Sequence, residues 1–81
     1  MFKELDLVVL TRALPEYGLC EGDLGTIVLV YDESHFEVEF VRASGHTQAL
    51  IELSSTDLRP AEPSDMLAVR PLTALKSRAD I

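Results

Sequence analysis

The chain has 81 residues and a formal net charge of −7, from seven basic and fourteen acidic residues. That length suits one small domain with a thin core. A hydrophobic fraction of 47% is too high for a disordered chain. The single cysteine excludes a disulfide framework and a multi-cysteine metal site.

The N-terminal sequence does not resemble a signal peptide, and no apolar run approaches the roughly 18 residues of a membrane span. We therefore expect a cytoplasmic protein without a membrane partner.

Residues 5–60 show the periodicity of short strands separated by turns. Residues 5–11 form a β-rich run that ends in a loop containing proline and glycine. Residues 26–31 are apolar at nearly every position, which is typical of a central strand covered on both faces. We assign the two glycines before this run, Gly22 and Gly25, to turn geometry.

The clearest strand covers residues 36–40, where apolar residues alternate with glutamates. A fourth strand over residues 47–53 must keep its apolar residues on the same face of the sheet as the apolar residues of 36–40. This requires a loop with an even number of residues, either 44–45 or 43–46, because a three-residue loop would put Glu52 inside. The side chains expected to point inward from these two strands are Phe36, Val38, Phe40, Ala49, Ile51 and Leu53.

Residues 54–58 predict one capped helical turn, and Leu58 to Pro60 form a short closing strand. These elements predict an all-β fold: a small five-stranded SH3-like β-barrel over residues 1–60, with one helical turn before the last strand. Closure of the sheet would remove its exposed edges.

Residues 61–81 form a C-terminal arm of different composition. The barrel sequence carries the whole net charge of −7, whereas the arm has equal numbers of acidic and basic residues. Pro71 prevents one continuous helix. Three alternatives are open: a frayed terminus, an arm that packs on a neighbouring chain, or an arm folded back on its own barrel. The apolar residues concerned are Met66, Leu67, Val69, Leu72 and Leu75.

No residue set predicts catalysis, a cofactor or a metal. Cys20 has acidic neighbours that disfavour a reactive thiolate, so we interpret it as a buried or idle thiol. His35 and His46 fall at opposite ends of one hairpin, roughly 25 Å apart at 3.3 Å per residue, and cannot share an ion within one subunit.

The candidate partner-binding residues include three glutamates on the outer face of the sheet. Glu37 and Glu39 share that face, and the expected register puts Glu52 opposite Glu37. An exposed sheet face is no catalytic cleft, but it could dock or steer a basic partner. Tyr17 is the one aromatic residue expected at the surface, and with a barrel charge of −7 we expect no nucleic-acid binding.

Several segments together resemble the DUF4926 family, small bacterial proteins of unknown function. The resemblance covers about residues 5–60 and rests most specifically on the Leu-Pro-Glu-Tyr-Gly motif followed by Gly-Asp-x-Gly-Thr. The segments that carry it are residues 6–11, 14–19, 22–28, 36–40 and 57–60.

A looser similarity links the chain to the SH3-like barrel of the nitrile hydratase β subunit, which is the partner of a metal-bearing subunit. It rests on Pro15, Tyr17, Gly22, Gly25 and residues 37–40. This similarity implies a barrel that docks a partner, and no catalytic role is carried over.

Our leading hypothesis is a non-enzymatic protein-binding module, either an accessory subunit or an inhibitor or immunity-type partner of a neighbouring gene product. Homo-oligomerisation through the arm, at Met66, Leu67, Val69 and Leu72, is part of it. The alternative is a small-ligand or regulatory binding domain that uses the loop from Pro15 to Tyr17.

Overall fold

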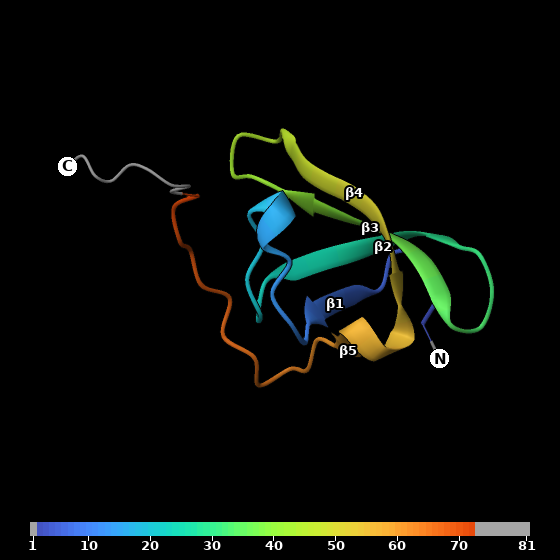
Figure 1. Ribbon diagram of the computed structural model, residues 1–81. Helices are drawn as coiled ribbons and strands as arrows, with labels where there is room; N and C mark the ends of the chain where they lie inside the picture. Colours follow the sequence, from blue (N-terminus) through green and yellow to red (C-terminus); the bar gives the residue numbers. More distant parts are fainter. Residues whose placement is uncertain (1, 73–81) are drawn as a thin grey trace.

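The computed structural model describes residues 2–72, which contain five antiparallel strands and two short 3-10 helices (Figure 1). The strands are β1 (Leu7–Leu10), β2 (Leu24–Val30), β3 (His35–Val41), β4 (Thr47–Ser54) and β5 (Leu58–Pro60). The 3-10 helices are η1 (Pro15–Tyr17) and η2 (Ser55–Asp57).

The fold is the all-β, five-stranded SH3-like barrel predicted from the sequence. Its strands follow the order β4-β3-β2-β1-β5 in one sheet that coils around the core (Figure 1). One detail of the prediction was wrong. In the described residues no strand ladder joins β4 to β5, so the sheet keeps two edges instead of closing fully.

The helical turn η2 connects these two edges and is capped as predicted. The Ser54 side chain accepts from the N–H of Thr56, and Asp57 Oδ2 accepts from the Ser54 N–H at 3.0 Å. The end of β1 is attached to the same turn, because Thr11 N–H donates to the Asp57 carbonyl at 2.9 Å and Arg12 Nε donates to Asp57 Oδ1 at 2.7 Å. Asp57 thus holds both the turn η2 and the end of β1 in place.

The core is built around the side chains of β3 that point inward at every second position. Phe36, Val38 and Phe40 have at most 2% of their surface exposed, and the glutamates between them point to the other face. The side chains packed around them are Val8, Leu10, Leu14, Leu19, Ile27, Ala49, Leu53 and Leu58. Ile51 is only partly buried, against the same cluster.

The predicted register between β3 and β4 is correct, but the loop that produces it is not the expected one. Phe36 pairs with Leu53, and Glu37 pairs with Glu52. The turn is a three-residue loop, since Arg42 N–H donates to the His46 carbonyl at 2.9 Å across it. The register then shifts between Phe40 and Val41, and this irregularity restores the inward face.

The prediction that β2 is covered on both faces was wrong. β2 does lie in the middle of the sheet, and Ile27 is fully buried. Beyond a bulge at Val28, however, Val28, Leu29 and Val30 are 36–42% exposed, and Tyr31 is 51% exposed. In this chain the uninterrupted apolar run therefore belongs to a strand that is buried at its beginning and exposed at its end.

Gly25 is not a turn residue, in contrast to the prediction. Gly22 has a φ of +95° and fits a turn, whereas Gly25 lies within β2 and is buried. A Cβ on Gly25 would lie 2.7 Å from Cε2 of Phe40 and 2.8 Å from Cγ1 of Val38. Glycine is required here because the strand backbone packs directly on the core.

We expect Gly25→Ala to lower the free energy of unfolding by about 1–3 kcal/mol, because the added methyl group overpacks the core. Urea denaturation measures this. In a Phe40→Leu background the same substitution should cost less, since the ring atoms that it meets are gone. Additive effects of Gly25→Ala and Phe40→Leu would contradict the proposed contact.

Candidate functional site

The first part of the C-terminal arm is anchored to the barrel by Asp65. Arg59 of β5 donates two hydrogen bonds to this carboxylate, both at 2.9 Å, in a bidentate pair. The Glu62 N–H donates to Asp65 Oδ2 at 2.7 Å, which closes a turn at the start of the arm. These bonds lower the pKa of Asp65 to about 2, with the Arg59 bonds contributing most.

A second anchor lies near the end of the described arm, at Arg70. Its Nε donates to Asp23 Oδ1 at 3.0 Å, and its Nη2 donates to the Gly18 carbonyl at 3.0 Å. Burial raises the pKa of Asp23, but the bonds from Arg70 and the Cys20 N–H outweigh it and hold the pKa below its usual value. The arm is therefore folded back on its own barrel as far as Leu72.

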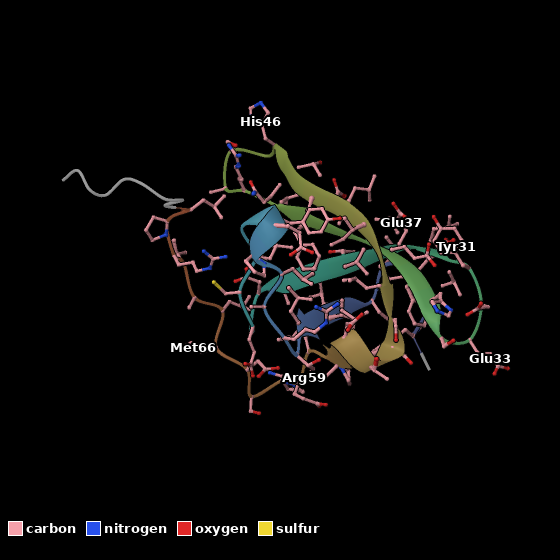
Figure 2. The ribbon with its side chains drawn as sticks, in the orientation of Figure 1. Tyr31, Glu33, Glu37, His46, Arg59 and Met66 are labelled. Carbon is pink, nitrogen blue, oxygen red and sulfur yellow. The ribbon has the colours of Figure 1, made fainter. Side chains whose placement is uncertain are left out.

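Between these anchors the apolar side chains face away from the barrel. Met66 is 86% exposed, Leu67 72% and Val69 97%. Figure 2 shows Met66 on the outside of the arm. Beneath the arm, Val9 on the outer side of β1 is only 6% exposed and shares a shallow groove with Met66 and Leu67.

The arm thus combines features of two of the sequence-based alternatives. Residues 61–72 lie on their own barrel, but the side chains expected to meet a neighbouring chain remain available. Leu72 is half-buried, and Leu75 lies outside the described residues.

The predicted acidic face is present on the outer side of β3 and β4. Glu37 and Glu52 are directly opposite each other, and Glu39 is opposite Leu50. We call these three glutamates the acidic face. Leu50 is 52% exposed beside them, and Leu29 of β2, opposite Glu37, is 42% exposed. The face is therefore both acidic and apolar.

Tyr31 belongs to this face and was missed by the sequence analysis, which expected Tyr17 to be the one exposed aromatic residue. The Tyr31 hydroxyl donates to Glu37 Oε1, and this bond raises the pKa of Tyr31 (Figure 2). Its position as the last residue of an apolar run concealed it. The signal was the Asp-Glu-Ser turn that follows, because a residue at a hairpin end is readily exposed.

Tyr17 is 40% exposed on η1, and its carbonyl accepts a hydrogen bond from Gln48 Nε2 at 2.9 Å. The structure does not gather the predicted partner-binding residues into one site. Figure 2 shows Tyr31 and Glu37 on one side of the barrel and Met66 on the other. Two separate surfaces result: the acidic face and the exposed arm.

A groove of about 680 Å³ lies between the arm and the β3–β4 turn. Leu72, Val41 and Gln48 are among its lining residues, so the arm reaches the start of β4. The loop from Pro15 to Tyr17, suggested for a small ligand, lines neither this groove nor the one over Val9.

The residues considered for other chemistry are dispersed. Cys20 is exposed, so of the two interpretations, a buried or an idle thiol, the first is wrong. His35 begins β3 and His46 lies beyond its far end, as expected from the hairpin. Within residues 2–72, no three histidine, cysteine or acidic side chains come close enough together to hold a metal ion. Over the same residues, no helix has the length and apolarity needed to cross a membrane.

Comparison with known proteins identifies the family. Residues 4–60 match the family described as a domain of unknown function, DUF4926. No curated protein and no solved structure matches the chain, so the looser similarity to the nitrile hydratase β subunit is not supported.

The Arg59–Asp65 pair predicts how the arm responds to acid. Because the pKa of Asp65 is lowered from 3.8 to about 2, the pair is intact above pH 4 and is lost as the pH falls through about 2. The carboxyl-carbon chemical shift of Asp65 reports this titration. In Arg59→Lys, which keeps the charge but loses the bidentate geometry, the pKa should rise toward its ordinary value.

Titration of Asp65 at its ordinary value in the unaltered protein would show that the arm is not held by Arg59.

Proposed function

We propose that this chain, which belongs to the DUF4926 family, is a non-enzymatic protein-binding module that docks its partner through the exposed arm. The observation that carries the proposal is the row of Met66, Leu67 and Val69, which are 72–97% exposed although the arm on either side of them is anchored by ion pairs. An apolar row held facing outward is typical of an interaction surface.

The energetics support binding at this row. Full burial of a large apolar side chain gains about 1.5–3 kcal/mol, so three of them supply a useful driving force. The two ion pairs at Asp65 and Arg70 hold the arm in place before binding, which reduces the conformational entropy lost when the partner docks.

The partner is either a neighbouring gene product, for which the chain acts as accessory subunit or inhibitor, or a second copy of the chain. Its contact surface is apolar and complementary to the arm. The acidic face lies elsewhere on the barrel and supports long-range attraction of a basic partner more than it supports tight contact.

The test is affinity capture from native lysate with the full chain and with a variant carrying Met66→Ser, Leu67→Ser and Val69→Ser. Mass spectrometry identifies bound proteins, and light scattering on the purified chain measures self-association. We expect one stoichiometric partner, or a dimer, that is lost in the triple variant.

Leu5→Ser is the matched control, because Leu5 is 79% exposed but lies outside the arm. It should leave binding unchanged. If the triple variant binds as the unaltered chain does, or if neither a partner nor self-association is found, the proposal is wrong.

A further inference from the structure

The groove between the arm and the β3–β4 turn has a volume of about 680 Å³, a size typical of small-molecule sites. Its apolar lining comes from both sides, with Leu24 and Val41 on the barrel and Leu72 on the arm. Val41 is 60% exposed and Leu24 is 38% exposed, so both offer apolar surface to a ligand. An apolar group can therefore bind between the arm and the barrel.

Four charged side chains also line this groove, and their formal charges balance. They are Arg42, Arg70, Asp23 and Glu39. Arg70 and Asp23 neutralise each other, since Arg70 Nε donates to Asp23 Oδ1 at 3.0 Å. Glu39 has a neutral partner, the Thr47 hydroxyl, which donates to Glu39 Oε2 at 2.6 Å. Arg42 is then the cation of the groove with which a ligand can pair.

Among the arginines of residues 2–72, only Arg42 lacks a carboxylate partner. Its Nε donates to Gln48 Oε1 at 2.8 Å, and Gln48 Nε2 donates to the Tyr17 carbonyl at 2.9 Å. This series of bonds orients the guanidinium through Nε alone, and no acceptor for Nη1 or Nη2 is present within the same residues. The two Nη groups are thus free to donate to a ligand from a position that is already fixed.

The geometry and charge of the groove select the kind of anion. Two N–H donors in the plane of a guanidinium match the two oxygens of a carboxylate. A single negative charge is sufficient to pair with Arg42. Each further charge would be repelled by Asp23 and Glu39, which line the same groove. These features favour a monocarboxylate over a phosphate dianion.

We propose that this groove binds a small monocarboxylate with an apolar body. The carboxylate accepts hydrogen bonds from Nη1 and Nη2 of Arg42, and the apolar body packs against Leu24, Val41 and Leu72. This inference does not rest on the proposed function, because it concerns a small molecule, and Met66 and Leu67 of the exposed row do not line this groove.

Titration of the isotope-labelled full chain with octanoate tests the proposal, with binding followed by amide chemical shifts. We expect saturable binding at one site, with shifts at Val41, Arg42 and Leu72. Octanamide has the same apolar body but no charge, so it should bind more weakly by about tenfold or more.

Substitutions of Arg42 separate its charge from its geometry. Arg42→Gln removes the cation and should weaken octanoate binding by about tenfold or more. Arg42→Lys keeps the charge but loses the planar pair of donors, so its affinity should fall between the two. The matched control is Lys3→Gln, which removes the same charge outside the groove and should leave the affinity for octanoate unchanged.

The absence of a saturable shift up to about 10 mM octanoate would overturn the proposal. Equal affinity of Arg42→Gln and the unaltered chain for octanoate would also overturn it, as would equal affinity of the unaltered chain for octanoate and octanamide. Inorganic phosphate is the competing anion. If it binds as tightly as octanoate does, the groove is a general anion site and the proposed class of ligand is wrong.

Discussion

The packing of Phe40 against the backbone of Gly25 is the constraint on which the rest of the barrel depends. β2 pairs with β1 on one side and with β3 on the other, so it must bend while it stays in both ladders. At Gly25 the strand backbone approaches the core without a side chain between, which leaves the space for the Phe40 ring. A side chain at Gly25 would occupy the space that Phe40 and Val38 fill, so the packing of β3 on β2 depends on this glycine.

Outside the strands, arginine–aspartate pairs hold the segments in place. Arg12 binds Asp57 at η2, Arg59 binds Asp65 in the arm, and Arg70 binds Asp23 beside the loop before β2. Each arginine is thereby committed to a connecting segment. In a chain with a net charge of −7, this use of the cations leaves the glutamates of the sheet face without basic neighbours among the described residues.

The sequence predicted what depends on local pattern. The alternation of β3 identified its inward face, and the Ser-Ser-Thr-Asp segment identified η2 with its cap. The cross-strand pair of Glu37 and Glu52 followed from the requirement that apolar residues stay inside.

What the sequence did not predict depends on contacts between distant residues. Gly25 looked like a turn glycine because the ring that it accommodates is far along the chain. The exposed end of β2 looked buried because apolar composition does not show how far a partner strand extends. The arm was left open among three arrangements, since ion pairs such as Arg70–Asp23 join residues that no periodicity connects.

The β3–β4 hairpin has a consequence for how such sequences can diverge. Its odd-numbered turn and the irregularity next to Phe40 each shift the register by one residue, and together they cancel. Removing one residue from the turn alone would rotate β4 by one position and bring Glu52 into the core. Length changes in this hairpin are therefore tolerated only in compensating pairs, so relatives with a different turn must also differ at the bulge.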